Sequence, residues 1–285
     1  MKIGFIGIGV MGSGMIRNLR KAGYDVEIYA RSTQKAKPLT DEGVVLAESV
    51  PRLCKGKDVL ITIIGAPKDV EAMYLGENGV LDNMAPGSVV IDMTTSSPSL
   101  AKRIYAEAKT KGISALDAPV SGGSVGARDA TMTIMPAGDK EAVDKVMPLF
   151  QAMGKNIFYM GEAGCGQSTK LANQIACAGA IGALLDTNEY ANALGLDKQR
   201  LFEVLVTCTA SSYHMKGMYP RLLSGNFEPG FMIKHFVKDL LIAKGEVEAR
   251  GGSLPIVDKM LGYYEKMMEN GQQELDFSAV IENWK

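Results

Sequence analysis

The chain has 285 residues, of which 46% are hydrophobic and 22% charged, a balance typical of a globular protein with a substantial core. This length accommodates one large domain or two ordinary ones. The 31 basic and 32 acidic residues leave a formal net charge of −1. No basic surplus indicates nucleic-acid binding and no acidic tail indicates disorder, so any positive patch is local, as in a phosphate pocket.

The cysteines and histidines indicate no metal site and no disulfide framework. The four cysteines are far apart and show no C-x-x-C spacing, so we expect reduced thiols in a cytoplasmic protein. His214 and His235 are isolated and not spaced as metal ligands. The apolar run at the N-terminus is too short for a signal peptide. The longest small and apolar run, residues 175–185, falls well short of the ~20 residues of a membrane span, so no membrane association is expected.

Apolar runs alternate with helical periodicity in the first half of the chain. The runs predict strands at residues 3–6, 26–29, 59–64, 89–91 and 113–116, and the intervening segments, such as 10–22 and 99–110, predict helices. Strands that alternate with helices form β-α-β units and a mostly parallel sheet, whose strands are apolar on both faces. We therefore expect an α/β, doubly wound domain over residues 1–162.

The second half is predicted to be helical. Residues 167–194 contain no proline and predict one helix of about 28 residues, whose middle is apolar nearly all round and must be buried. Further helical segments cover residues 197–206, 237–250 and 255–270. We expect an all-α domain over residues 163–285, which the long helix joins to the first domain.

A glycine-rich turn directly follows the first strand and precedes a helix. Its G-x-G-x-x-G sequence comprises Gly7, Ile8, Gly9, Val10, Met11 and Gly12. In this context the first glycine allows a tight turn, the second lets a pyrophosphate approach the backbone, and the third lets the helix pack on the strand. The helix N-terminus then attracts the phosphates. The turn predicts a Rossmann domain that binds a dinucleotide.

The tip of the second strand favours NADP over NAD. An NAD enzyme usually carries an acid at this tip to bind the ribose hydroxyls, whereas Asp25 and Glu27 lie early in the strand and Arg31 and Ser32 stand at its end. A guanidinium binds a 2′-phosphate with paired hydrogen bonds, and a neighbouring hydroxyl adds another. The alternative is that Arg31 is a solvated surface residue and that NAD is the cofactor.

A second glycine-rich turn precedes the long helix. Ser168 or Thr169 is expected to cap this helix, which places Lys170 in its first turn and puts Lys170, Asn173 and Gln174 on one face. The positive end of the helix dipole there lowers the pKa of a lysine, which suits proton exchange near neutral pH. We interpret Lys170 as the acid/base of a carbonyl reduction and Asn173 as its positioner. The alternative is a surface lysine.

Small polar residues follow the last two predicted strands. Ser121, Gly122 and Gly123 offer a hydroxyl and backbone N–H groups that suit a carboxylate. Thr95 lies after the fourth strand and is expected near the nicotinamide. Ligands of open α/β sheets bind outside the carboxyl ends of the strands, although either segment alone is also compatible with a plain strand-ending turn.

Together these segments resemble the β-hydroxyacid dehydrogenase family, which includes 3-hydroxyisobutyrate dehydrogenase, tartronate semialdehyde reductase and the glyoxylate/succinic semialdehyde reductases. The resemblance covers essentially the whole chain and rests on four ordered motifs, at residues 7–12, 117–123, 166–174, and 229–231 followed by 237–240. It implies an NADP-dependent oxidoreductase that interconverts a small β-hydroxy acid, of the 3-hydroxyisobutyrate, 4-hydroxybutyrate, glycolate or glycerate type, and its semialdehyde.

The resemblance also implies residue roles. Lys170 would be the acid/base, and Asn173 and Gln174 would contact the substrate. Thr95 and Lys238 would contact the cofactor, and Phe231 would line the substrate pocket together with Ser121, Gly122 and Gly123. Family members are commonly homodimers or homotetramers, so a homo-oligomer is expected, with a small carboxylate-bearing substrate as the partner molecule.

Three alternative functions are compatible with a dinucleotide-binding fold. 6-Phosphogluconate dehydrogenase has the same architecture but is longer and carries a histidine where Ala172 stands. Imine reductases share the fold but usually lack the lysine. A non-catalytic dinucleotide sensor would have lost Lys170 or the Ser121 loop, and both are present.

Overall fold

The protein is described by a computed structural model that covers residues 1–228 and 230–284. The chain forms two compact units, Met1–Lys170 and Leu171–Lys285. The first unit contains nine strands: β1 (Lys2–Ile6), β2 (Asp25–Tyr29), β3 (Val45–Leu46), β4 (Val59–Thr62), β5 (Val89–Asp92), β6 (Ser114–Asp117), β7 (Val120–Ser121), β8 (Met132–Ile134) and β9 (Gly154–Ile157). Its helices are α1 (Val10–Lys21), α2 (Thr33–Asp41), α3 (Val50–Cys54), α4 (Pro67–Leu75), α5 (Val80–Asn83), α6 (Pro98–Thr110), α7 (Gly123–Asp129) and α8 (Lys140–Met153).

Six of these strands form one parallel sheet with the order β3-β2-β1-β4-β5-β6. This is the strand order of the Rossmann fold, in which ligands bind at the carboxyl ends of the strands near the point where the order reverses. That point lies between β1 and β4. The expected doubly wound α/β fold is confirmed, and the glycine turn after β1 lies where the fold binds dinucleotides.

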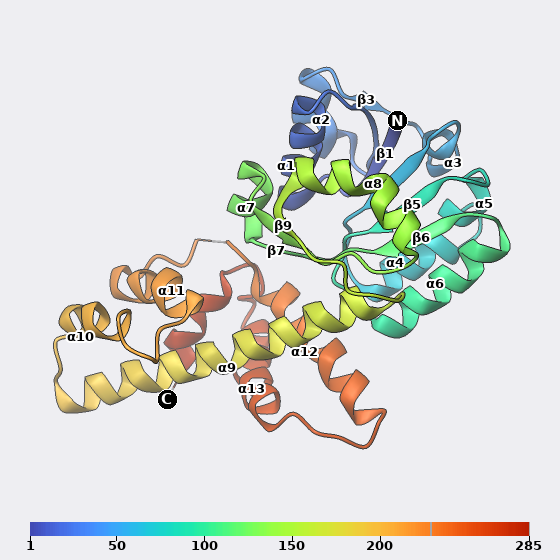
Figure 1. The fold of residues 1–285 in the computed structure, drawn as a ribbon. Helices are drawn as coiled ribbons and strands as arrows, with labels where there is room; N and C mark the ends of the chain where they lie inside the picture. Colours follow the sequence, from blue (N-terminus) through green and yellow to red (C-terminus); the bar gives the residue numbers. More distant parts are fainter. Residues whose placement is uncertain (229, 285) are drawn as a thin grey trace. The chain divides into compact units, whose positions relative to one another are not determined.

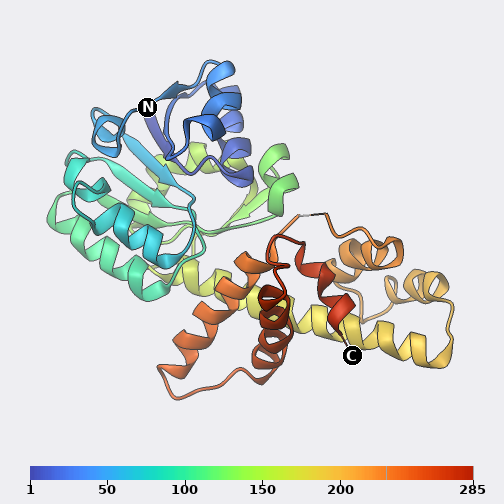
Figure 2. The same ribbon diagram turned by 180° about the vertical axis from the view of Figure 1, so that it is seen from behind.

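Both faces of the sheet are covered by helices, as Figures 1 and 2 show from opposite sides. Successive strand residues alternate between two cores: in β4, Val59 and Ile61 pack with α1, α2 and α8, whereas Leu60 packs with α3, α4 and α6. This alternation follows from the two-residue period of a strand. It explains why the sequence shows unbroken apolar runs rather than alternating ones.

The first unit is richer in strands than the apolar runs predict. β3 has two residues, and β7, β8 and β9 form a separate three-stranded sheet with antiparallel and parallel pairs. These strands are two to four residues long and mix polar with apolar residues, so they carry little periodic signal. They follow the predicted strands in the chain and lead to the long helix.

The long helix α9 runs over Cys165–Leu194 (yellow in Figure 1) and is followed by α10 (Lys198–Leu205), α11 (Tyr213–Ser224), α12 (Ile233–Glu248), α13 (Pro255–Glu269) and the 3-10 helix η1 (Phe277–Asn283). The apolar stretch of α9 packs with α11, α12 and α13 in one core. At Gly182 an added Cβ would lie 3.2 Å from Met260 Sδ, so the glycine permits a close approach of α13. Among the described residues, no helix combines the length and the hydropathy of a membrane-spanning segment.

Candidate active site

The glycine turn uses its three glycines in different ways. Gly7 has φ +107°, and a Cβ there would overlap the carbonyl oxygen of Ile63 after β4; a Cβ at Gly12 would overlap Gly7 O. These two glycines are therefore required by the protein itself. Gly9 has an ordinary φ of −64°, and a Cβ there would meet nothing within 4 Å. The open space beside Gly9 fits a group that must come close to the backbone.

The N-terminus of α1 is arranged to receive an anion. Gly9 is the N-cap residue and provides no side-chain cap, and the first turn carries no acidic residue. The first N–H groups of a helix have no partner within the helix and concentrate positive potential. The nearby hydroxyl of Ser13 donates to Ile8 O at 2.8 Å. This turn fits the pyrophosphate of a nicotinamide dinucleotide, for which the open Gly9 leaves room.

The tip of β2 presents a cation and no available acid. Arg31 is exposed, and within the described residues its side chain makes no hydrogen bond or ion pair. Glu27, inside β2, is engaged by Lys57 at 2.6 Å and by Arg52 at 3.5 Å. Ser32 caps α2 by accepting from Lys35 N at 3.4 Å, and the first turn of α2 has no acidic residue. The positive end of α2 therefore lies beside Arg31.

The carboxyl ends of β5 and β6 carry two buried aspartates. Asp92 Oδ1 accepts from Thr62 Oγ1 at 2.9 Å and from Thr94 N at 3.1 Å. Burial, with a smaller contribution from the negative charge of Asp117, raises the pKa of Asp92 from 3.8 to about 6, against the hydrogen bonds that its carboxylate accepts from Thr94 and Thr62. Burial also raises the pKa of Asp117 from 3.8 to about 6, against the hydrogen bonds that its carboxylate accepts. The edge of the sheet therefore holds two carboxyl groups that ionise less readily than a carboxyl group in water.

These raised pKa values predict a pH-dependent stability. A carboxyl whose folded-state pKa exceeds its unfolded value binds more protons when folded, so its contribution to stability falls as pH rises from about 4 to about 6 and is constant above. The shift of Asp92 from 3.8 to about 6 corresponds to roughly 3 kcal/mol. Asp92→Asn removes this titration. As pH rises from 4 to 7, we therefore expect the free energy of unfolding of Asp92→Asn to increase relative to that of the wild type by up to that amount.

Urea unfolding of both proteins at the two pH values, followed by circular dichroism, measures this gain. The exposed Asp82→Asn is the matched control, because its carboxyl lies on the surface. An equal pH dependence of the wild type and Asp92→Asn would contradict the raised pKa.

The N-terminus of α9 is held by a carboxylate from β6. Asp117 Oδ1 accepts from Gly164 N at 2.7 Å, and Oδ2 accepts from Gln167 N at 2.8 Å. The expected cap by Ser168 or Thr169 is wrong: both lie inside the helix and donate to the carbonyl groups of Gly164 and Cys165. The capping residue lies 47 residues earlier in the chain, whereas the sequence rules for helix starts consider only neighbouring residues.

Lys170 lies in the second turn of α9, since the helix begins at Cys165. The prediction of a first-turn lysine is therefore wrong, and the helix dipole, which fades beyond the first turn, does not act strongly on Lys170. Lys170 is 6% exposed and is the only buried lysine among residues 1–228 and 230–284. Lysine is almost never buried without a specific reason, so the position favours a functional ammonium over a surface residue.

The Ser121 loop leads into helix α7, which packs on α1. Ser121 ends β7, and Gly122 and Gly123 follow with φ +139° and +62°, conformations that favour glycine. The helix α7 that they start packs closely on α1: Asn18 Nδ2 donates to Ala127 O at 2.7 Å. Within the first unit, the helix that follows the predicted carboxylate-binding loop thus packs on the helix that follows the predicted cofactor turn.

A chain of polar contacts links three predicted residues in the second unit. Asn173 Nδ2 donates to Gln174 Oε1 at 2.8 Å, and Gln174 Nε2 donates to Asp239 Oδ2 at 2.7 Å. Lys238 Nζ lies 2.9 Å from Asp239 Oδ1 as an ion pair. Gln174 is 3% exposed and Asp239 1%. The amide of Gln174 therefore aligns Asn173 on α9 with α12.

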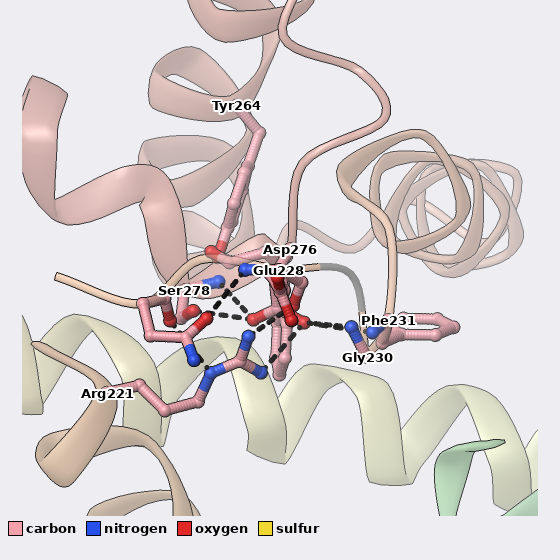
Figure 3. A network of polar contacts seen from close by, with 9 residues as sticks. Arg221, Glu228, Gly230, Phe231, Tyr264, Asp276 and Ser278 are labelled. Carbon is pink, nitrogen blue, oxygen red and sulfur yellow. Dashed lines mark hydrogen bonds and ion pairs between the residues drawn. The ribbon is translucent and has the colours of Figure 1, made fainter. Parts of the chain in front are cut away.

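Phe231 is held by a buried carboxylate, as Figure 3 shows. Asp276 Oδ2 accepts from Gly230 N and Phe231 N, both at 2.9 Å, and pairs with Arg221 Nη1 at 3.2 Å. The Phe231 ring packs edge-on against Phe277 with the centroids 5.8 Å apart. Asp276 thus fixes the backbone that presents Phe231. Pro229 of the predicted motif lies outside the described residues.

Family models cover nearly the whole chain. Residues 2–161 match the NAD binding domain of 6-phosphogluconate dehydrogenase, and residues 164–284 match the NAD-binding domain of NADP-dependent 3-hydroxyisobutyrate dehydrogenase. The chain belongs to the β-hydroxyacid dehydrogenase family. Like other members, this dehydrogenase binds a nicotinamide dinucleotide and is an NAD(P)-dependent oxidoreductase acting on a CH–OH group.

Individual relatives agree with this assignment. The dehydrogenase is 43% identical over 282 residues to the uncharacterized oxidoreductase YkwC of Bacillus subtilis, covering 99% of this chain and 98% of the relative. It is 34% identical to 2-hydroxy-3-oxopropionate reductase of Escherichia coli, covering 99% and 96%. A solved structure of Mycobacterium tuberculosis 3-hydroxyisobutyrate dehydrogenase with L-serine is 32% identical, covers 99% of this chain and 98% of its own, and has a TM-score of 0.91.

Three buried polar residues of the dehydrogenase were not singled out by the sequence. Asp117, Gln167 and Asp239 stand inside the recognised motifs, but no role followed from their spacing. Each acts through a partner far along the chain: Asp117 on Gly164, Gln167 on Thr94, and Asp239 on Gln174. The available signal was their polarity within otherwise apolar or glycine-rich segments. Among the described residues, no group of three His, Cys, Asp or Glu side chains is placed to hold a metal ion.

Proposed function

We propose that the enzyme interconverts a small β-hydroxy acid and its semialdehyde with NADP, and that Lys170 is the general acid/base. The observation that carries this proposal is the buried Lys170, one turn beyond a helix N-terminus that is fastened to the carboxyl edge of the sheet through Asp117 and Gln167. A buried amine at the ligand-binding edge of a dinucleotide fold is suited to move one proton to or from a carbonyl oxygen.

The proposed chemistry divides between cofactor and chain. The bound dinucleotide supplies the hydride for reduction and accepts it in oxidation. In reduction, the ammonium of Lys170 donates its proton to the carbonyl oxygen, which becomes the hydroxyl; in oxidation, the neutral amine takes the hydroxyl proton. Asn173 orients the substrate or the lysine, and Gln174, through its amide contacts with Asn173 and Asp239, positions Asn173.

The remaining proposed contacts divide between the two ligands. Ser121, Gly122 and Gly123 bind the substrate carboxylate with a hydroxyl and N–H groups, and Phe231 contacts the substrate. Residues 7–12 hold the pyrophosphate. Thr95 and Lys238 contact the cofactor. A small substrate with a carboxylate near the reacting carbon suits this set of short polar donors.

NADP is favoured by the tip of β2. Arg31 stands exposed next to the positive end of α2, and the acid Glu27 is already paired. A 2′-phosphate would gain charge-assisted hydrogen bonds from Arg31 and Ser32, whereas the ribose hydroxyls of NAD would find no carboxylate there.

We expect Arg31→Ala to reduce kcat/KM with NADPH by roughly 10- to 100-fold and to leave the value with NADH nearly unchanged. A hydrogen bond to a charged group contributes about 1.5–3 kcal/mol, and only NADPH has the phosphate that receives it. Nicotinamide absorbance measures both rates. Arg103→Ala is the control, because Arg103 is exposed and pairs with Glu71. A wild-type preference for NADH would refute the proposed role of Arg31.

Substrate specificity is tested by mixing purified protein and NADPH with a panel of aldehyde acids and measuring turnover. The panel comprises glyoxylate, succinic semialdehyde, tartronate semialdehyde and methylmalonate semialdehyde. We expect turnover with at least one, and pocket shape to rank them by factors of ten or more. Reduction of cyclic imines without reduction of any semialdehyde would favour an imine reductase. Tight NADPH binding without turnover of either class would favour a sensor.

We also propose a homodimer or homotetramer. Large apolar side chains of the second unit are exposed, among them Tyr190, Leu194, Val204 and Tyr213, and exposed apolar groups of this size favour association. Light scattering coupled to size exclusion measures the mass; a monomer would refute this proposal.

A further inference from the structure

The side chain of Gln167 joins α9, which carries the proposed acid/base Lys170, to the segment 94–96, which contains the proposed cofactor contact Thr95. Its Nε2 donates to Thr94 O at 2.7 Å, and its Oε1 accepts from Ser96 N at 2.8 Å. Thr95, the proposed cofactor contact, lies between these two backbone groups. One amide therefore holds both flanks of Thr95.

The fit of this amide is specific. Gln167 is 0% exposed, so water does not compete for its partners. A carbonyl oxygen only accepts and a backbone N–H only donates, so Thr94 and Ser96 together require a group with one donor and one acceptor, side by side. Glutamine offers this pair, whereas an apolar residue of the same length would leave two buried backbone groups unsatisfied.

The root of the side chain is equally fixed. The N–H of Gln167 donates to Asp117 Oδ2. At the preceding residue, Gly166, an added Cβ would lie 2.8 Å from Asp117 O, so the helix start fits closely against β6. Lys170 follows Gln167 by three residues and lies on the same side of α9. A displacement of Gln167 therefore moves Lys170 relative to Thr95.

We propose that Gln167 is a positioning residue that sets the placement of Lys170 relative to the Thr95 segment, and hence the alignment of proton and hydride transfer. The role rests on the proposed function of Lys170. Gln167 contacts neither substrate nor the reacting atoms in this role; it acts through the backbone of residues 94–96 and through α9. Catalysis is sensitive to such alignment, since a displacement of about 1 Å can slow a reaction roughly 100-fold.

The test compares the wild type with Gln167→Met, which keeps the length but removes the amide. We expect kcat to fall roughly 10- to 100-fold, and the primary isotope effect with NADPH deuterated at the transferred position to rise because hydride transfer becomes slower than other steps. The Kd for NADPH, from nicotinamide fluorescence, should change less than kcat, since the proposed pyrophosphate contacts at residues 7–12 lie outside the segment that Gln167 holds. Gln167→Glu, which keeps the shape but sets a carboxylate oxygen against Thr94 O, is the second variant and shifts both quantities in the same direction.

A second readout needs no turnover. Hydrogen exchange of the segment 93–97 measures the bond that Ser96 N donates, and we expect exchange to be roughly 2- to 10-fold faster in Gln167→Met, the range for loss of one hydrogen bond. The matched control is Ser88→Ala, which removes a partly buried hydrogen bond to Ala85 O at the opposite end of β5 and leaves the isotope effect and this exchange unchanged.

The two readouts separate the possible failures. If the wild type reduces no semialdehyde, the proposed function fails, and exchange still reports whether Gln167 holds residues 94–96. If turnover is normal in both Gln167 variants and their isotope effects equal that of the wild type, Gln167 only packs and the inference is overturned. Equal losses of kcat in Gln167→Met and Ser88→Ala, with unchanged isotope effects, would overturn it too.

Discussion

Replacing Lys170 by alanine is expected to lower kcat for semialdehyde reduction by roughly 10²- to 10⁴-fold, the usual contribution of a positioned acid/base. The ammonium is buried in the second turn of α9, so bulk water has poor access to replace it as proton donor. The Kd for NADPH should change little, because the proposed phosphate contacts lie at residues 7–12 and 31–32. Steady-state kinetics and fluorescence titration measure the two quantities separately.

Two controls make this result specific. Lys170→Arg keeps the positive charge but carries a guanidinium that does not release its proton near neutral pH, so it should be about as slow as Lys170→Ala. Lys55→Ala removes an exposed lysine of the same unit and should leave kcat unchanged. If Lys170→Ala retained activity within a few-fold of the wild type, another group would carry the proton and the central proposal would be wrong.

The sheet could be predicted because four of its strands, β1, β4, β5 and β6, are buried on both faces. Five of the six parallel strands appear in the sequence as apolar runs, and the glycine turn identifies the first of them. β3, with two residues, and β7 to β9, with mixed polarity, carry no comparable pattern. Their pairing depends on contacts with distant residues, such as Val120 with Ile134, which local periodicity does not encode.

The parts of the candidate site that are formed by a local motif could be predicted. The parts that depend on contacts between residues far apart in the sequence could not. The open space at Gly9 agrees with the expected pyrophosphate turn. The cap of α9 was misplaced because Asp117, rather than a nearby hydroxyl, accepts its N–H groups. The same error put Lys170 one turn too early. The feature that favours a functional role for Lys170 is its burial, which no single-sequence pattern reports for a lysine.

Substitutions at the glycines of the first turn distinguish glycines that the fold requires from a glycine that cofactor binding requires. Gly12→Ala would drive its Cβ into Gly7 O and toward Ile63 Cγ2, and a methyl without space costs about 1–3 kcal/mol or more of stability. We expect this variant to melt at a lower temperature and to bind NADPH poorly, because the turn itself is distorted.

Gly9→Ala should behave differently. Its backbone is ordinary and the methyl meets no protein atom within 4 Å, so the melting temperature should stay near that of the wild type. The pyrophosphate, however, must approach the backbone where the methyl would stand. A clash of about 1–3 kcal/mol raises the Kd for NADPH roughly 5- to 150-fold.

Calorimetric melts and fluorescence titration of both variants measure these two effects. Gly217→Ala, on α11, is the control, since its added Cβ also meets nothing within 4 Å and no dinucleotide contact is proposed there. Normal NADPH affinity in Gly9→Ala would show that the pyrophosphate does not pass over this turn. Loss of affinity with normal melting would instead show that the glycine is needed for ligand binding, because the protein itself has room for a side chain at this position.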